Sequence, residues 1–94
     1  MQKEHDYELT RRLEQILTDG STFISWNELY LWYGVQKIAA ATYRDLANRW
    51  EEISDGYTVG KAPLGELHFV QSPMKVSPGM YLFGANMPQR VSND

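Results

Sequence analysis

Apolar side chains recur with helical spacing in the first part of the chain. Four of them fall at i, i+4, i+7 and i+8: Leu9, Leu13, Ile16 and Leu17. This spacing places them on one face of a helix, which we expect over about residues 6–18. Gly20 is well placed to end that helix, because glycine is favoured just after a helix C-terminus. Phe23 and Ile24 then suit a very short strand.

The segment from Trp26 to Tyr33 carries the local signals of a second helix. Ser25 and Glu28 have capping-box spacing, in which the serine hydroxyl accepts from the Glu28 amide and the carboxylate reaches back. Gly34 is expected to end the helix. At 100° per residue, one face carries the apolar side chains that we expect to contact the core: Trp26, Leu29, Tyr30 and Tyr33.

A third and longer helical pattern spans residues 36–53, followed by Ser54-Asp55-Gly56 as its stop. Its apolar stripe consists of Ala39, Tyr43, Leu46, Ala47, Trp50 and Ile53. The three consecutive alanines at 39–41 favour helix and leave a thin surface that another molecule can approach closely.

The sequence pattern in the second half of the chain predicts β-strands. Residues 57–59 and 66–71 are expected to pair around the Gly- and Pro-containing loop 60–65. A turn at residues 77–79 precedes a short apolar strand over residues 80–83.

Ninety-four residues with 43% hydrophobic content indicate one folded domain, which we expect over residues 1–84, with a flexible tail over 85–94. The chain has no cysteine, which excludes disulfides, a thiolate nucleophile and a Cys-based zinc site. Neither a signal peptide nor a membrane span is evident, so we expect a cytoplasmic protein that does not bind membranes.

The order of these elements, helix–strand–helix–helix–hairpin, is that of a winged helix-turn-helix. The segment GVQKIAAATYRDLANRW resembles the second half of this motif in bacterial regulators. Gly34 and Val35 match its Gly-Val turn, and Thr42 and Arg44 resemble its Thr-x-Arg recognition helix. Three extra residues separate the turn from Thr42, and Leu46 comes one position early.

The resemblance covers about residues 9–71. It implies a small α+β winged helix-turn-helix with three helices and a two- to three-stranded antiparallel sheet. The helix over residues 36–53 would then enter the major groove, and the loop at Lys61 would lie on the backbone or minor groove.

The solvent face of the third helix supplies the candidate DNA contacts. They are Gln36, Lys37, Ala41, Thr42, Arg44, Asn48 and Arg49, with Lys61 from the loop. Arg44, Lys37 and Asn48 are the first candidates for the groove, because Lys and Arg reach phosphates while Arg and Asn pair with guanine and adenine edges. Arg49 and Lys61 would contact phosphate. An ordinary solvated helix face is the alternative.

The net charge of the chain argues against DNA binding, whereas the local charge of the third helix favours it. The net charge of −3 argues against DNA binding, because phosphate contacts supply much of the affinity. Between Gln36 and Trp50, however, three cations face one acid, a local charge of +2. Lys61 is the only cation of its loop, so a hairpin that merely closes the core is the alternative to a wing.

A partner interface is also indicated. Leu31 lies about 140° from Trp26 on the second helix, away from the expected apolar face. The candidate interface residues are Leu31, Trp32, Tyr81 and Phe83. The alternative is that the strand over residues 80–83 folds back and covers Leu31 and Trp32.

The chain offers little for catalysis. His5 and His68 are isolated, Glu51 and Glu52 diverge on a helix, and no glycine-rich segment has phosphate-binding spacing. We therefore expect no enzyme, no metal and no cofactor.

Taken together, these patterns lead us to interpret the chain as a DNA-binding regulator of transcription that acts as a homodimer. The alternatives are a protein-interaction module on the same scaffold and a phage or plasmid accessory protein.

Overall fold

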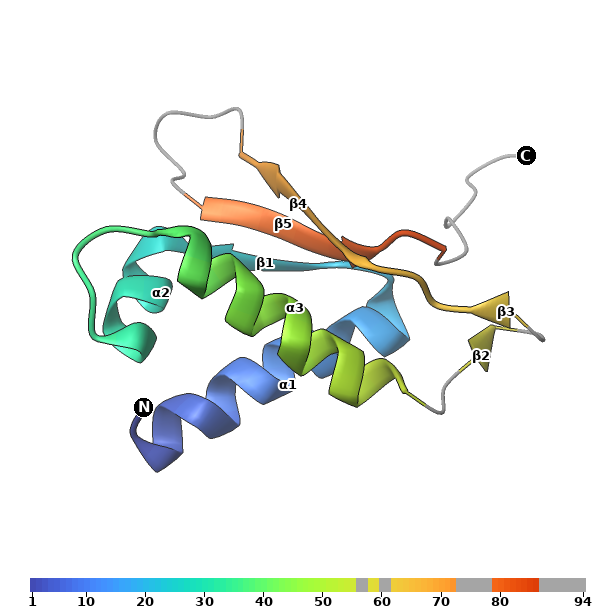
Figure 1. The fold of residues 1–94 in the computed structure, drawn as a ribbon, viewed down its shortest axis with the longest axis horizontal. Helices are drawn as coiled ribbons and strands as arrows, with labels where there is room; N and C mark the ends of the chain where they lie inside the picture. The colour runs from blue at the N-terminus through green and yellow to red at the C-terminus, as the bar shows by residue number, and fades with distance from the viewer. Residues whose placement is uncertain (56–57, 60–61, 73–78, 87–94) are drawn as a thin grey trace.

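The computed structural model describes residues 1–55, 58–59, 62–72 and 79–86. Three helices lie against one face of a three-stranded antiparallel sheet (Figure 1). The helices are α1 (Lys3–Asp19), α2 (Trp26–Tyr33) and α3 (Ala40–Ser54). The sheet contains β1 (Thr22–Ser25), β4 (Leu67–Gln71) and β5 (Gly79–Gly84), and a separate ribbon pairs β2 (Thr58–Val59) with β3 (Ala62–Pro63). The expected α+β fold is confirmed.

The first two helices follow from their local sequence. α1 ends at Gly20, whose φ of 88° is the left-handed conformation that glycine adopts without strain. α2 begins at the Ser25–Glu28 capping box, in which both reciprocal hydrogen bonds form, and it ends at Gly34 with φ 65°. The predicted caps are confirmed. α1 is longer than predicted, because its helical turns begin already at Lys3.

The core lies between the helices and the inner face of the sheet. Its buried members are Leu9, Leu13, Ile16, Ile24, Leu29, Trp32, Leu46, Trp50, Leu64, Leu67, Met80 and Leu82. On α2, Leu29 and Trp32 are buried, whereas Trp26 and Tyr33 are only partly buried. The predicted inward face of α2 is therefore confirmed for Leu29 and in part for Trp26 and Tyr33, which pack against the core cluster, but the prediction left out Trp32, which is buried.

β5 occupies the centre of the sheet, between β1 and β4. β4 does not pair with residues 57–59, as the sequence suggested, but with β5, in a register that places Leu67 opposite Gly84 and Gln71 opposite Met80. Residues 58–59 instead pair with 62–63 in the small ribbon. The hairpin of the main sheet is therefore β4–β5. Residues 73–78 lie outside the described part of the chain.

Two backbone hydrogen bonds attach the segment after β5 to the body of the protein. Ala85 donates to the carbonyl of Glu66, and Asn86 donates to that of Leu64, each at 2.8 Å. The folded body thus extends through Asn86. Within the described ranges, no helix has both the length and the apolar character needed to cross a bilayer.

Candidate nucleic-acid interface

Three of the predicted contact residues form one stripe on the solvent side of α3. Ala41, Arg44 and Asn48 are all exposed, and their spacing of three and four residues aligns them along the helix. The opposite side of α3 packs into the core through Leu46 and Trp50, whose exposed fractions are 0% and 1%. Anchoring on one side therefore presents Arg44 and Asn48 to solvent on the other.

Gln36 and Lys37 are exposed, but they do not lie on α3. The helix begins at Ala40, and Ala39 caps it in an extended conformation without a side-chain hydrogen bond. Ile38, in the irregular segment before the helix, packs against the core cluster. This contact holds the segment away from helical geometry, so the predicted start at residue 36 is wrong. Lys37 stands before the N-terminal end of α3.

Thr42 is wrongly assigned as a DNA contact. Its exposed fraction is 6%, because Thr42, Leu46 and Trp50 follow one another at four-residue intervals on the inward side of α3. Tyr43, predicted to point inward, is partly buried at the side, where its ring meets that of Phe69 edge to face at 5.1 Å between centroids.

Arg49 is not available as a phosphate contact, because its guanidinium already forms ion pairs with two aspartates. Its Nε donates to Asp45 Oδ2 at 2.7 Å, and its Nη1 pairs with Asp6 from α1. The Tyr33 hydroxyl donates to the same Asp45 oxygen at 2.6 Å. Asp45 is already counted in the local charge of +2 that the sequence indicated, so it is the pairing with Asp6 that reduces this charge.

This network shifts the ionisation of its members. Burial and the hydrogen bond to Asp45 raise the pKa of Tyr33 above its ordinary value. Burial opposes ionisation of Asp45, but the hydrogen bonds from Tyr33 and Arg49 prevail and lower its pKa. Asp6, Tyr33 and Asp45 were not among the residues predicted for the site. The four-residue spacing of Asp45 and Arg49 on a helix was the available signal for part of this network.

The network borders a hollow of about 370 Å³ beside the first half of α3. Its lining residues are Met1, Tyr33, Val35, Ala41, Thr42, Asp45 and Arg49. The two charged side chains of this lining, Asp45 and Arg49, already hydrogen-bond each other.

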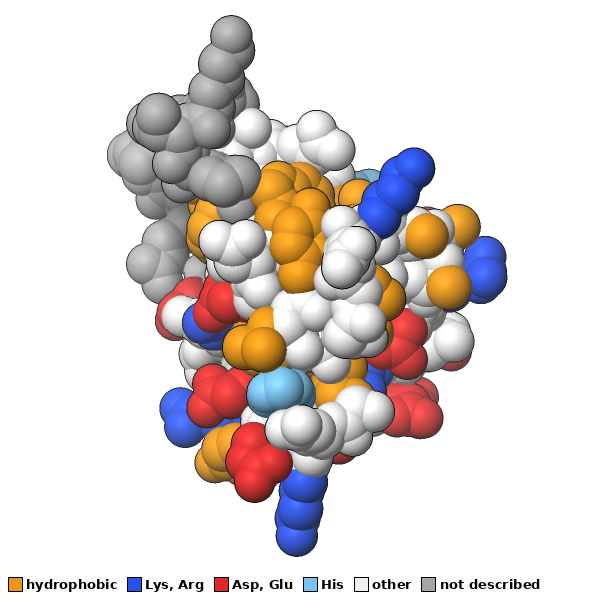
Figure 2. Space-filling view, turned by 90° about the vertical axis from the view of Figure 1, so that its left-hand side faces the viewer, with side chains coloured by type: hydrophobic (Ala, Val, Ile, Leu, Met, Phe, Trp, Pro, Cys, Tyr) orange, Lys and Arg blue, Asp and Glu red, His pale blue; other side chains and the backbone are white. Residues whose placement is uncertain are grey.

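Charges of both signs are interspersed on the end of the molecule at which α3 begins. Figure 2 views the end of the molecule that carries the N-terminus and the segment before α3, and its Lys and Arg side chains stand apart, with Asp and Glu between them. Toward the C-terminal end of α3, Glu51 and Glu52 are exposed, and Asp55 follows the helix. The candidate interface is therefore confined to the first half of α3. Lys61 lies outside the described residues.

The predicted partner residues do not form one surface. Leu31 is 62% exposed, whereas Trp32 is 6% exposed and lies in the core beneath the Arg12 guanidinium, 5.5 Å from the ring centroid. Trp32 is thus wrongly assigned to an interface, and the alternative that Leu31 is covered is also wrong. Tyr81 and Phe83 lie instead on the outer face of the sheet.

That outer face is rich in aromatic side chains. Tyr81 is 45% exposed and its ring lies 5.0 Å from that of Phe23 on β1. Phe83 meets His68 of β4 at 5.5 Å between ring centroids. Val70 of β4 is 49% exposed on the same face.

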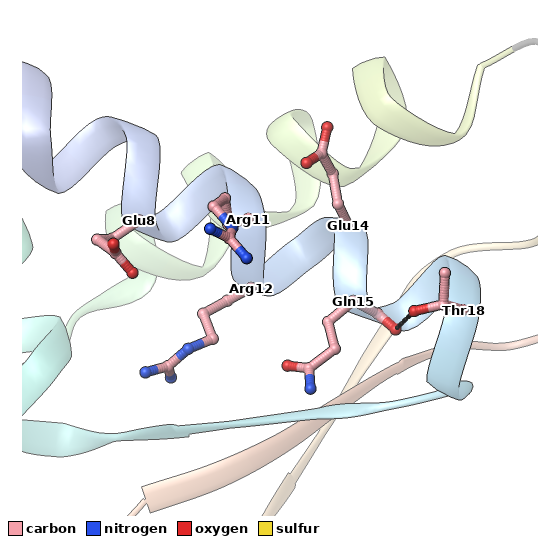
Figure 3. Close-up of a pocket in the computed structure, with 6 residues that line it drawn as sticks. All are labelled: Glu8, Arg11, Arg12, Glu14, Gln15 and Thr18. Atoms are coloured by element: carbon pink, nitrogen blue, oxygen red, sulfur yellow. Dashed lines mark hydrogen bonds between the residues drawn. The ribbon is translucent and has the colours of Figure 1, made fainter.

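A larger hollow, of about 550 Å³, runs along α1. Figure 3 shows that all its lining side chains come from this single helix: Glu8, Arg11, Arg12, Glu14, Gln15 and Thr18. Arg12 and Gln15 point toward β1. With walls from one element only, the hollow is a groove on the helix surface, not an enclosed small-molecule site. Among the described residues no group of three potential metal ligands converges.

Comparison with known proteins adds no identification: no family model, no curated protein and no solved structure matches this chain.

Proposed function

We propose that this protein is a DNA-binding regulatory domain that uses α3 as its recognition helix and acts as a homodimer. The observation that carries the proposal is the stripe of Ala41, Arg44 and Asn48, exposed on a helix whose other side is anchored in the core. The winged-helix order of elements supports it, because in that arrangement the third helix enters the major groove.

The side chains on the stripe suit base and phosphate recognition. The guanidinium of Arg44 can donate two hydrogen bonds to guanine, and the Asn48 amide can pair with adenine. The small side chain of Ala41 allows close approach of the backbone. Lys37 precedes the N-terminal end of the helix and is exposed, which suits a phosphate contact.

The acids restrict the docking geometry. Glu51 and Glu52 would repel phosphate, so the N-terminal half of α3 must lie in the groove and the C-terminal end must point away. With Arg49 neutralised by its acids, few cations remain for phosphate. We therefore expect weak affinity for each domain and a shallow dependence on salt.

Binding of a fluorescent mixed-sequence duplex, measured by anisotropy across a salt series, tests this function. Arg44→Ala is expected to weaken binding about tenfold or more and to reduce the salt slope by about one ion. Arg11→Ala is the matched control, because Arg11 is also exposed and its loss changes the net charge equally, but it lies on α1. Equal effects of the two variants, or no binding by the intact protein at low salt, would refute the proposal.

A protein-interaction module on the same scaffold is the second candidate. The exposed Leu31 and the aromatic outer face of the sheet favour it, as does the net charge of −3. If Leu31→Ser abolishes capture of a protein partner while the intact protein shows no affinity for DNA, this second function holds and the first fails.

A further inference from the structure

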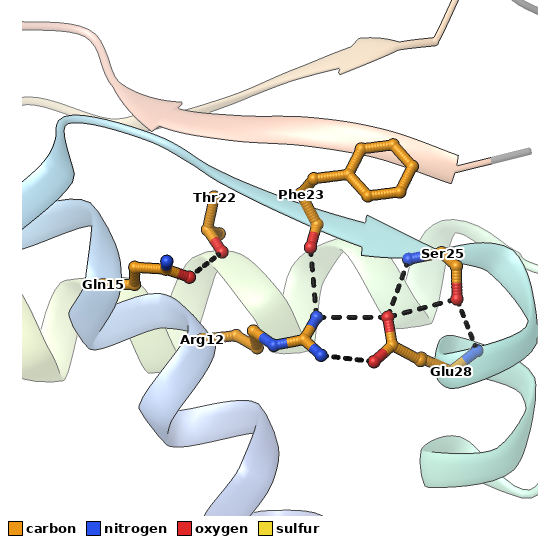
Figure 4. A network of polar contacts seen from close by, with 6 residues as sticks. All are labelled: Arg12, Gln15, Thr22, Phe23, Ser25 and Glu28. Carbon is orange, nitrogen blue, oxygen red and sulfur yellow. Dashed lines mark hydrogen bonds and ion pairs between the residues drawn. The ribbon is translucent and has the colours of Figure 1, made fainter. Parts of the chain in front are cut away.

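The two edges of the three-stranded sheet differ in how their backbone groups are satisfied. At the β1 edge, the outward carbonyl of Phe23 accepts from Arg12 Nη1 at 3.1 Å. The outward N–H of Ser25 donates to Glu28 Oε1 at 3.0 Å. Arg12 and Glu28 also pair with each other (Figure 4). This edge is closed by side chains from α1 and α2.

Among the described residues, no side chain hydrogen-bonds to the β4 edge in this way. Ser72 donates to the carbonyl of Gly79 at 3.0 Å, and Ala85 donates to that of Glu66, so these pairs bond across β4 and β5. Backbone groups alternate in direction along an antiparallel strand. The residues of β4 whose N–H and C=O point away from β5 are therefore Leu67, Phe69 and Gln71. Within the described part of the chain, nothing hydrogen-bonds to these outward groups.

The sequence of β4 lacks the usual protection of an edge strand. Natural edges are blunted by charge, proline, bulges or shortness. β4 has five residues, none of them charged or proline, and it pairs with β5 in an unbroken register. The side chains of β4 on the outer face of the sheet, His68 and Val70, are both exposed. An open, uncharged edge of this kind is a template for another strand.

We propose that β4 is a dimerisation edge, at which two copies of this chain pair β4 with β4 in antiparallel fashion about a twofold axis at Phe69. In this register Phe69 lies opposite the partner's Phe69, and Leu67 lies opposite the partner's Gln71. All three outward-pointing residues of each strand then form backbone hydrogen bonds. The result is a continuous six-stranded sheet.

A second copy fits this edge for two reasons. The strand is self-complementary, because pairing places no charge opposite a like charge: His68 lies beside the partner's Val70. The assembly also closes at two copies, because each outer edge of the joined sheet is a β1 already occupied by Arg12 and Glu28. An unrelated extended peptide would gain the same backbone bonds without this match.

The interface is small. A five-residue edge buries less than the roughly 1,200 Å² of a standard stable interface, so the dimer should dissociate on dilution. It joins the outer faces of two sheets, which brings the aromatic surface around Tyr81 and Phe83 of each copy into one continuous face. This inference does not depend on DNA binding by α3.

Disulfide trapping between two different single-cysteine variants tests the register directly. The chain has no cysteine of its own. In the proposed pairing, residue 68 and the partner's residue 70 form a non-hydrogen-bonded pair with Cα atoms about 4.5 Å apart, within disulfide range. Residue 68 and the partner's residue 68 are diagonal, at about 7–8 Å. Mixed His68→Cys and Val70→Cys proteins, one of them isotope-labelled, should therefore yield the mixed disulfide in large excess over either homodimer.

A statistical mixture of the three disulfides, or no crosslink, would overturn the register. The strand contact itself is tested by Gln71→Pro, which removes an outward N–H and no bond to β5. Sedimentation equilibrium should show the intact protein and the matched Gln71→Ala control in a concentration-dependent monomer–dimer equilibrium. Gln71→Pro should raise the dimer Kd about tenfold or more, with an unchanged monomer melting curve. An intact protein that stays monomeric, one that assembles without limit, or equal constants for the two variants would each refute the proposal.

Discussion

At the residue scale, the Arg12–Glu28 pair joins α1, α2 and the edge of β1. Glu28 accepts from Arg12, from the Ser25 amide and from the Ser25 hydroxyl. Its partial burial opposes ionisation, but the hydrogen bonds from Arg12 and Ser25 prevail and lower its pKa from the ordinary value of 4.5. The ionised carboxylate is therefore the form that the fold stabilises.

This lowered pKa predicts the direction of the pH dependence. A carboxyl whose pKa is lower in the folded state stabilises the protein above its unfolded pKa, and the contribution is lost as the pH falls through the folded pKa. Glu28→Gln should lower the free energy of unfolding by about 1 kcal/mol at pH 7, and this loss should shrink below about pH 4.5. Urea melts of both proteins at pH 3 and pH 7 measure this loss of unfolding free energy. A loss that is the same at pH 3 and pH 7 would contradict the assigned role.

Trp50 links α3 to the segment before β4. Its side chain is 1% exposed, and its Nε1 donates to the carbonyl of Gly65 at 3.0 Å. Trp50→Phe removes this bond and leaves a small cavity, so it should destabilise the protein by about 1–3 kcal/mol. Trp26→Phe, at a partly buried position, should cost clearly less. Comparable costs in thermal melts would argue against the anchoring role of Trp50.

At the element scale, some helix ends are determined by neighbouring residues, whereas the start of α3 is determined by contacts with residues distant in sequence. The capping box of α2 and the glycines after α1 and α2 could be read from the sequence, because each acts within a few residues. The start of α3 could not, because Ile38 contacts the core through residues distant in sequence. The partner of β4 was missed for a different reason: residues 57–59 and β5 are separated from β4 by connections of similar length, so the local pattern did not distinguish the two pairings.

A substitution at the N-cap of α3 should increase the stability of the protein. Ala39 occupies the N-cap position in an extended conformation and makes no side-chain hydrogen bond. Ala39→Ser should stabilise the protein by about 1 kcal/mol, because the hydroxyl can accept from a free amide of the first turn. Ala41→Ser, two residues inside the helix, should instead destabilise it by about 0.5 kcal/mol. Chemical denaturation of both variants checks this, and the same sign for both would place the helix start elsewhere.

At the scale of the whole molecule, the candidate site was only partly predictable. Exposure of Arg44 and Asn48 follows from helical periodicity and is confirmed. The burial of Thr42 was not evident, because a rotation of the helix by one position exchanges it with Tyr43. The neutralisation of Arg49 depends on Asp6, 43 residues away in the chain, which no local pattern indicates.

Two features of the whole molecule bear on the proposed function: the exposed stripe on the first half of α3, which we propose as the recognition surface, and the β4 edge, which we propose as the dimer contact. α3 packs near β4, as the contact between Tyr43 and Phe69 shows. A dimer formed through β4 would therefore place two α3 helices on the same side of the joined sheet. Paired recognition helices raise affinity without new contacts within each domain, which suits a domain with few free cations.

The most direct test of the central claim is an NMR titration of isotope-labelled protein with a short mixed-sequence duplex at low salt. The account predicts that the largest amide shifts fall between Ala40 and Asn48 and at Lys37, with smaller shifts toward Glu51 and along α1. Shifts concentrated on the outer face of the sheet or on α1, with the first half of α3 unchanged, would contradict it.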